Sequence, residues 1–285
     1  MQSCLIIINK SAGSADKISF DYVKNRMGAG YNFSCHTIPC DGEPDLDKYN
    51  ALAVCGGDGT LSSILTGVYD KQKDVYYFPY GTLNDKAKTR VGTKHAVVGV
   101  VGEDCDTVFA YVFAAGSFTP IGYNTSVKMK KRFGVLAYLA HVIKEYKIHS
   151  IHAKVVADDK IYSGDFTLVM FIKSPRCFGF KFNRAYDEES ESGHIVLIRS
   201  PKLKGLLGKI EMFFPFFKVF FLGLKKEREG KIVFKQIRQA DLCLQSQTDF
   251  CKDGEKVVAS GNLTVCFQKT KCNLNLMQRN KNGTL

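Results

Sequence analysis

The sequence predicts an α/β domain followed by a mostly antiparallel β-sandwich domain. Three observations lead to this fold class. Short apolar runs alternate with helix-length polar segments as far as residue 118, polar glycine-containing loops follow three of these runs, and strand-like runs separated by polar turns fill the second half. With 285 residues, 45% of them hydrophobic, the chain is long enough for two domains. We expect domains at 1–118 and 119–285, with the last residues as a candidate for packing back on the first domain.

The first half of the chain contains five runs that are typical of buried strands. They lie at residues 4–9, 32–37, 51–55, 76–79 and 95–101. Short apolar runs bounded by polar segments are typical of strands that are covered on both faces, as in a parallel sheet with helices on each side. This half of the chain therefore predicts the α/β domain.

The second half has a different pattern. A stripe formed by Leu136, Leu139, Ile143 and Tyr146 predicts a helix over 134–146. Strand-like runs follow at 151–156, 161–172, 195–199, 231–237, 240–245 and 263–267, and a polar turn at 158–160 separates the first two. Several strands joined by polar turns are typical of an antiparallel sandwich.

The most informative segment is the end of the third run, where the apolar residues 51–55 lead directly into the loop Gly-Gly-Asp-Gly-Thr at 56–60. Glycines at a strand end let the backbone approach a bulky anion, and the N-terminus of the following helix attracts negative charge. The Asp58 carboxylate would repel phosphates unless a cation or an ordered water lies between them, which indicates a metal-borne nucleotide. The alternative is a tight turn in which Asp58 caps the helix.

Two similar loops follow two other runs. Residues 10–14 after the first run read Lys-Ser-Ala-Gly-Ser, and residues 80–85 after the fourth run read Tyr-Gly-Thr-Leu-Asn-Asp. Both loops place glycine and hydroxyl groups at the C-terminal end of a strand. Because the carboxyl ends of parallel strands share one edge of a sheet, we expect the three loops to converge on a single crevice.

These motifs resemble those of the lipid kinases in the diacylglycerol kinase and sphingosine kinase group. An Asn-x-Ser-Gly-like first loop, Gly-Gly-Asp-Gly-Thr, Pro-x-Gly-Thr-x-Asn-Asp and a late Asp-Gly-Glu at 253–255 occur in that order. Residues 109–119 and 132–139 are similar to the stretch after the catalytic loops of soluble bacterial diacylglycerol kinases, so the resemblance covers nearly the whole chain. The first loop lacks the family's usual proline, and either Lys88 or Arg90 matches the residue that faces phosphate.

The resemblance implies an N-terminal nucleotide-binding domain and an active site in the interdomain cleft. The implied reaction transfers the γ-phosphoryl group of ATP to the hydroxyl of diacylglycerol and gives phosphatidic acid. A kinase for another lipid alcohol, such as a sphingoid base, and an NAD kinase-like enzyme are the alternatives. The implied cofactors are ATP and Mg²⁺, and Asp58 would contact the nucleotide's Mg²⁺ through water.

The resemblance also implies the residues of the site. The catalytic base is either Glu255 or Asp253, although Asp-Gly taken alone predicts a hairpin turn. The nucleotide-binding residues are Asn9, Lys10, Ser11, Ala12, Gly13, Thr37, Gly56, Gly57, Asp58, Gly59, Thr60, Thr82, Asn84 and Asp85. Relatives often have an Asp-Gly pair that helps bind a structural magnesium ion where this chain has the acidic segment 187–194. Asp187 and Glu191 are candidate ligands there, while an acidic surface turn is the alternative that the departure from Asp-Gly favours.

The net charge of +12 indicates an anionic partner, for which a membrane and nucleic acid both qualify. The very apolar stretch 212–224 is too short to span a bilayer, and Lys209, Lys218, Lys225 and Lys226 lie in it or beside it. This pattern suits an anionic membrane surface, and a core helix with a solvated basic face is the alternative.

The remaining signals concern partners and compartment. The chain has no RNP-like, zinc-finger or helix-turn-helix signature, which argues against a basic nucleic-acid-binding protein. The 10 scattered cysteines, without a Cys-x-x-Cys pair, favour a reduced protein. We therefore expect a cytoplasmic, peripherally membrane-associated protein whose partners are a nucleotide and a lipid and not nucleic acid, with a homodimer left open.

Overall fold

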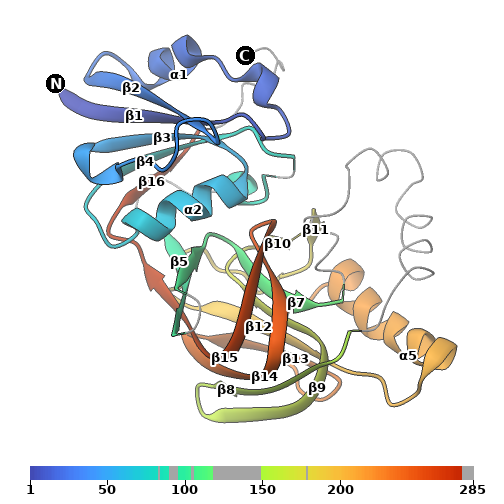
Figure 1. Ribbon diagram of the computed structural model, residues 1–285. Helices are drawn as coiled ribbons and strands as arrows, with labels where there is room; N and C mark the ends of the chain where they lie inside the picture. The colour runs from blue at the N-terminus through green and yellow to red at the C-terminus, as the bar shows by residue number, and fades with distance from the viewer. Residues whose placement is uncertain (83, 90–95, 104–105, 118–148, 178, 278–285) are drawn as a thin grey trace. The chain divides into compact units, whose positions relative to one another are not determined.

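The computed structural model describes residues 1–82, 84–89, 96–103, 106–117, 149–177 and 179–277 (Figure 1). The chain divides into two compact units. The first comprises Met1–Val98 together with Lys269–Leu285, and the second comprises Gly99–Gln268.

The first unit is built on a parallel sheet. Its strands are β1 (Gln2–Asn9), β2 (Tyr31–Ile38), β3 (Ala51–Gly56), β4 (Asp74–Pro79) and β16 (Asn273–Leu276). They lie in the order β16-β4-β3-β1-β2, and every pairing in this order is parallel. After β1 the chain adds β2 on one side and then β3 on the other, so the sheet has a topological switch point between β1 and β3, where open α/β sheets bind ligands.

Helices cover both faces of this sheet. Strand β3 is buried at every residue, and Ala51, Ala53 and Cys55 share a core cluster with Val23 of helix α1 (Phe20–Met27). Because side chains alternate along a strand, the residues between them face the opposite side, where Figure 1 shows helix α2 (Asp58–Val68). Short 3-10 turns lie at η1 (Ala15–Lys17), η2 (Leu46–Lys48) and η3 (Lys86–Lys88).

The second unit is dominated by a large, mostly antiparallel sheet. Its path is β13-β12-β9-β7-β14-β15-β5-β6, and β8 pairs with both β14 and β9. These strands are β5 (Val97–Glu103), β6 (Thr107–Phe109), β7 (Val112–Gly116), β8 (Ile151–Ala157), β9 (Lys160–Ile172), β12 (Gly193–Arg199), β13 (Ile232–Ile237), β14 (Gln239–Lys252) and β15 (Glu255–Lys269). A small hairpin joins β10 (Arg176–Cys177) and β11 (Phe180–Lys181). The predicted order of an α/β domain and a mostly antiparallel β-rich domain is confirmed.

The boundary between the units differs from the prediction. The chain divides between Val98 and Gly99, so the expected boundary at residue 118 lies inside the second unit. The reason is long-range pairing, because β7 pairs with both β9 and β14. Conversely, the last strand β16 returns to the first unit and pairs with β4, as Figure 1 shows. The helix predicted over 134–146 lies outside the described residues.

The apolar stretch of the second unit forms helix α5 (Gly205–Phe217), which continues as one π-helical turn, η4 (Lys218–Leu222). Met212, Phe216 and Val219 on this element pack in the core beneath the sheet. Among the residues that the structure describes, no helix is long and apolar enough to cross a membrane.

Candidate functional site

Three loops of the first unit meet at the carboxyl edge of its sheet. The Asn9 side-chain amide at the end of β1 donates to Thr60 Oγ1 in the first turn of α2 over 2.8 Å. The backbone N–H of Ser14 donates to the Tyr80 carbonyl over 2.9 Å, and that of Gly81 donates to the Gly56 carbonyl over 3.0 Å. The structure thus brings together the loops after β1, β3 and β4, around the β1/β3 switch point.

Close backbone approach explains the glycines of this cluster. A Cβ atom on Gly81 would lie 2.5 Å from the Gly57 Cα and 2.6 Å from the Asn84 side-chain oxygen. A Cβ on Gly13 would collide with the hydroxyl of Thr82. Because no larger residue fits without moving a neighbouring loop, these glycines let the three loops pack against each other.

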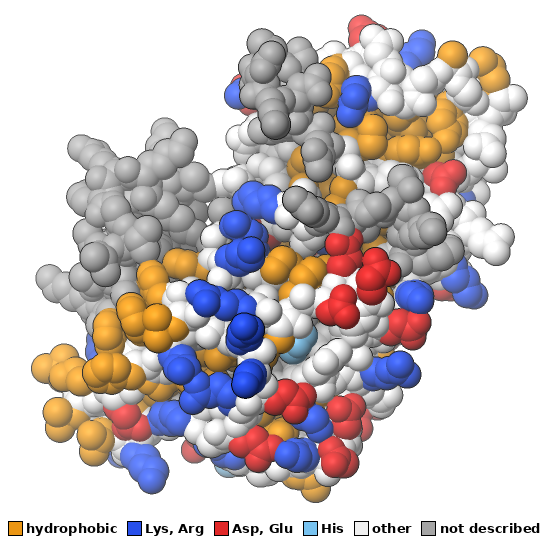
Figure 2. All heavy atoms as spheres, turned by 180° about the vertical axis from the view of Figure 1, so that it is seen from behind, with side chains coloured by type: hydrophobic (Ala, Val, Ile, Leu, Met, Phe, Trp, Pro, Cys, Tyr) orange, Lys and Arg blue, Asp and Glu red, His pale blue; other side chains and the backbone are white. Residues whose placement is uncertain are grey.

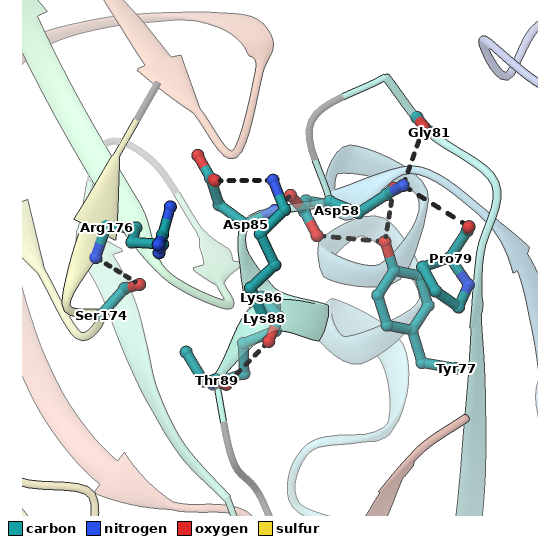
Figure 3. Close-up of polar contacts among 11 residues, drawn as sticks. Asp58, Tyr77, Pro79, Gly81, Asp85, Lys86, Lys88, Thr89, Ser174 and Arg176 are labelled. Atoms are coloured by element: carbon teal, nitrogen blue, oxygen red, sulfur yellow. Dashed lines mark hydrogen bonds and ion pairs between the residues drawn. The ribbon is translucent and has the colours of Figure 1, made fainter. Parts of the chain in front are cut away.

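Asp58 is the first residue of α2 and is only 5% exposed. Its carboxylate accepts hydrogen bonds from the Tyr77 hydroxyl, over 3.0 Å, and from the backbone N–H of Asp85, over 2.6 Å (Figure 3). The N-cap of the helix is Gly57, which provides no capping side chain. Asp58 is therefore not the helix cap, and it links the start of α2 to the loop after β4.

Asn84 organises the third loop. Its backbone has a φ of 49°, and its side-chain amide donates to the Gly81 carbonyl over 2.8 Å. Thr82 is exposed, whereas the Asp85 side chain is fully buried with Lys88 Nζ 3.5 Å from its carboxylate. Of the two cations that the sequence left open, Lys88 thus pairs with Asp85, and Arg90 lies outside the described residues.

The remaining predicted nucleotide-binding residues lie at the same edge of the sheet. Thr37 is near the end of β2 and pairs with Ile8 of β1. Lys10, Ser11 and Gly13 are exposed, and the Ser11 N–H donates to the Asn9 side-chain oxygen over 2.8 Å. The edge at which the three loops meet therefore presents a glycine-containing backbone to solvent.

Sequence reasoning missed two residues of this site. Tyr77 holds Asp58 and is fully buried, and Lys86 beside Asp85 is only 2% exposed. A tyrosine within an apolar strand has no distinguishing pattern, because buried aromatic residues are ordinary there. Lys86 is a charged residue between loop residues and reads as solvent-exposed until the fold is known.

A cavity lies at the opposite edge of this sheet. It has a volume of about 630 Å³ and lies at the amino ends of the strands. Its walls are formed by Gln2, Asn50, Gln72, Lys73, Asp74, Lys269, Thr270, Lys271 and Asn273. This cavity is therefore separate from the cluster of the three loops.

In the second unit, the Asp-Gly-Glu motif forms the hairpin turn between β14 and β15. Asp253 and Gly254 have φ values of 49° and 97°, the left-handed pair that two-residue hairpins require. Asp253 is buried, and its carboxylate accepts backbone N–H bonds from Ala110, from Tyr111 over 3.0 Å and from Val112 over 2.8 Å. Glu255 is exposed.

The surroundings of Asp253 act on its charge in opposite directions. Burial raises the pKa of the Asp253 carboxyl, whereas the three N–H bonds and the nearby Lys252 ammonium lower it. Burial is the largest of these effects, and the resulting pKa is about 6. Its oxygens are engaged in holding the start of β7. The geometry therefore favours a positioning role for Asp253 and leaves Glu255 as the candidate base, an assignment that stays a prediction.

The acidic segment 187–192 is arranged around a lysine. Lys173 is 2% exposed, and its ammonium donates to the backbone carbonyls of Asp187 and Ser192, each over 2.9 Å, and to that of Ser190. The Asp187 and Glu191 side chains are exposed. Within the part of the chain that is described, no group of three or more His, Cys, Asp and Glu side chains could hold a metal ion. This geometry favours the acidic surface turn.

We expect Lys173→Met to lower the free energy of unfolding by about 3 kcal/mol, because three carbonyl oxygens lose a charged donor in a buried place. Urea unfolding measures the loss, and Lys181→Met at an exposed position is the matched control. A chelator should leave the unfolding of the wild type unchanged. Strong destabilisation by the chelator would instead support a metal ion held by Asp187 and Glu191.

His194 follows this segment and is also buried. It is 5% exposed, its ring stacks on Phe234 with centroids 4.9 Å apart, and its Nδ1 lies 3.3 Å from the Asn183 side-chain nitrogen. Burial, together with the smaller effect of the Lys173 ammonium, lowers the pKa of His194 to about 4. The ring is therefore neutral at physiological pH.

A pH dependence follows from this environment. His194 takes up a proton near pH 6.5 in the unfolded chain but only near pH 4 in the folded chain. The stability that the neutral, buried ring contributes is therefore complete above pH 6.5 and is lost as the pH falls towards 4. The loss amounts to about 3 kcal/mol. We expect His194→Phe to remove this part of the acid dependence, measured as the difference in unfolding free energy from the wild type between pH 7 and pH 4. Parallel curves for both proteins would show that the ring titrates normally.

The first unit has the fold and loop cluster that are typical of nucleotide-binding α/β sheets. A family model described as the diacylglycerol kinase catalytic domain matches residues 3–108. A diacylglycerol kinase of Staphylococcus carnosus is 24% identical over 192 residues, which are 60% of this chain and 62% of the relative. One of Staphylococcus epidermidis is 23% identical over 220 residues, 68% of each chain.

A solved structure described as a diacylglycerol kinase from Bacillus anthracis has a TM-score of 0.63 at 14% identity, and the alignment covers 96% of both chains. At this identity the likeness shows the fold. The matched residues 3–108 include all three loops of the candidate site. The resemblance to the diacylglycerol kinase catalytic-domain family is thereby confirmed, at low identity.

Proposed function

We propose that the protein is a lipid kinase that transfers the γ-phosphoryl group of ATP to the hydroxyl of diacylglycerol and gives phosphatidic acid. The observation that carries the proposal is the cluster of three loops at the β1/β3 switch point, with Asp58 held in its centre by Tyr77 and Asp85. Phosphoryl transfer depends mainly on positioning and on neutralising charge, and this cluster provides the means for both.

The relatives support the substrate class. Those from Staphylococcus carnosus and Staphylococcus epidermidis are named diacylglycerol kinases, which makes diacylglycerol the first acceptor to test. The alignment spans 62% of the first of these relatives, so the substrate is carried over as part of the proposal. Another lipid alcohol, such as a sphingoid base, is the nearest alternative acceptor.

The residues of the loop cluster suit a nucleotide with Mg²⁺. The Asp58 carboxylate, the Asn84 amide and the Thr60 hydroxyl are hard oxygen donors, the kind that Mg²⁺ prefers, and Asp58 is the one we expect to contact its water shell. When bound, Mg²⁺ would supply positive charge to the phosphate oxygens. The loop backbone and the N-terminus of α2 would hold the phosphates, because α2 begins without a side-chain cap.

The reaction also needs a base for the acceptor. The lipid hydroxyl oxygen attacks the γ-phosphorus, the bond from that phosphorus to the β–γ bridging oxygen breaks, and the hydroxyl proton passes to the base. We assign this role to Glu255, whose carboxylate is exposed, whereas the Asp253 carboxylate holds backbone N–H groups. Asp253 would position the turn that carries Glu255.

Labelled ATP with a panel of acceptors in mixed micelles tests the proposal. The panel contains dioctanoylglycerol, sphingosine and, as a soluble acceptor, NAD. We expect ATP-dependent label in phosphatidic acid and none in NADP. Label in sphingosine phosphate alone would show that the acceptor is a sphingoid base and that the protein is still a lipid kinase. Label only in NADP, or no label with any acceptor, would contradict the assignment as a lipid kinase.

A further inference from the structure

Helix α5 carries apolar side chains on two opposite faces. Its inner face contains Met212 and Phe216, which are 1% and 6% exposed and pack in the core. Leu206, Ile210 and Phe214 follow each other at intervals of four residues on the outer face, about 180° around the helix from the inner face. Leu206 is 74% exposed, Ile210 53% and Phe214 68%. A helix on the surface of a soluble domain normally has a polar outer face, so this face is arranged for contact.

The outer face belongs to a larger apolar patch. Leu207 on the same helix is 61% exposed, and Leu203 before the helix and Leu222 at the end of η4 are each 51% exposed. Figure 2 shows hydrophobic side chains gathered on the left, on the side where α5 lies, with lysine and arginine side chains beside them. Single exposed apolar residues are ordinary, but a contiguous patch marks an interaction surface.

The charges around the patch are almost all positive. Between residues 202 and 226 the chain has six lysines and one glutamate, Glu211. The Glu211 carboxylate accepts the backbone N–H groups of Lys202 and Leu203 over 2.9 and 3.2 Å and pairs with Lys231 at 2.5 Å. Its negative charge is thus compensated by these partners within the fold. Lys202 and Lys204 lie exposed before α5, and Lys225 and Lys226 lie exposed after η4.

We propose that the outer face of α5, with the lysines at both ends, docks on an anionic lipid bilayer. Leucine, isoleucine and phenylalanine would enter the boundary between headgroups and acyl chains, and the lysines would contact the anionic headgroups. Charge complementarity favours a bilayer as the binding partner. The lysines at both ends of α5 match the negative headgroups, and the apolar outer face between them matches the acyl chains beneath. The biological role of this docking surface rests on the proposed function, because a lipid kinase meets its lipid acceptor at a membrane.

Vesicle sedimentation tests the docking surface without requiring catalysis. The wild type should bind vesicles of phosphatidylcholine with phosphatidylglycerol and should bind pure phosphatidylcholine vesicles at least tenfold less. The triple variant Leu206→Ser, Ile210→Ser, Phe214→Ser should lose at least tenfold in binding at an unchanged melting temperature. Ile161→Ser is the matched control, because Ile161 is 63% exposed but belongs to β9. The quadruple Lys202, Lys204, Lys225, Lys226→Gln variant should also lose at least tenfold, and high salt should weaken wild-type binding.

Three outcomes would overturn the proposal. Binding of the triple variant equal to that of the wild type would exclude this face from docking. A melting temperature several degrees lower would show that another part of the chain covers the face. A change of oligomeric state in the triple variant would assign the face to a second copy.

Kinase assays separate this inference from the proposed function. The triple variant should phosphorylate monomeric dioctanoylglycerol at the wild-type rate and long-chain diacylglycerol in vesicles at least tenfold more slowly. Absence of kinase activity in the wild type, with vesicle binding intact, would overturn the proposed function and leave the docking surface standing.

Discussion

Asp58→Asn should lower kcat for ATP-dependent lipid phosphorylation by about 1000-fold, the loss typical of removing one electrostatic contributor to a transition state. The amide has the size of the carboxylate, and its oxygen can still accept the Asp85 N–H, but its negative charge is gone. The melting temperature should therefore stay close to that of the wild type. Initial rates with dioctanoylglycerol and thermal unfolding measure the two effects.

Two further variants separate chemistry from packing at this position. Tyr77→Phe removes the hydroxyl that donates to Asp58 and keeps the carboxylate, so we expect less than a tenfold loss of kcat. Asp58→Ala leaves the Asp85 N–H without this acceptor in a buried place and should cost about 1–3 kcal/mol of stability as well as activity. Retention of more than a tenth of the wild-type rate by Asp58→Asn would reduce Asp58 to a structural link between α2 and the third loop.

Glu255→Gln should lower kcat by roughly 100-fold to 10,000-fold, the range associated with general base catalysis, without changing the affinity for ATP. Glutamine keeps the size of the side chain but does not take the proton. Because Glu255 is exposed, the melting temperature should not change. The measurement is kcat with lipid in micelles, together with the Kd for ATP.

Asp253→Asn is the companion variant and should behave differently. An asparagine nitrogen cannot accept a backbone N–H, so at least one of the three donors at residues 110–112 loses its partner. We expect a loss of about 1–3 kcal/mol of stability with any fall in activity following from it. A stable Asp253→Asn protein with kcat reduced by orders of magnitude, beside a normal Glu255→Gln protein, would reverse the two roles.

Local patterns in the chain predicted most of the strands and the three loops. The run 51–55 matches β3, and the runs 151–156 and 195–199 lie within β8 and β12, because hydrophobic patterning and polar turns are properties of neighbouring residues. The hairpin turn at Asp253 and Gly254 is local in the same sense, since it depends on two consecutive left-handed residues.

The contacts that assign roles to the site residues are not local. The Asp253 carboxylate accepts a hydrogen bond from the backbone N–H of Ala110, which is 143 positions away in the sequence. Asp58, at the start of α2, accepts one from the hydroxyl of Tyr77 on β4. The unit boundary and the return of β16 depend likewise on pairing between distant segments. The spacing of residues along the sequence does not predict such partners.

The amino-acid sequence by itself determined the order of the two folds, the glycine-containing loops and the resemblance to a lipid kinase family, since each rests on residues that are adjacent or regularly spaced. Only the tertiary structure decided that Asp58 is tied to Tyr77, that Asp253 is a buried acceptor while Glu255 is exposed, and that Lys173 occupies the centre of the acidic turn. The physical reason is that burial and hydrogen-bond partners arise from chain segments that meet only when the sheets assemble.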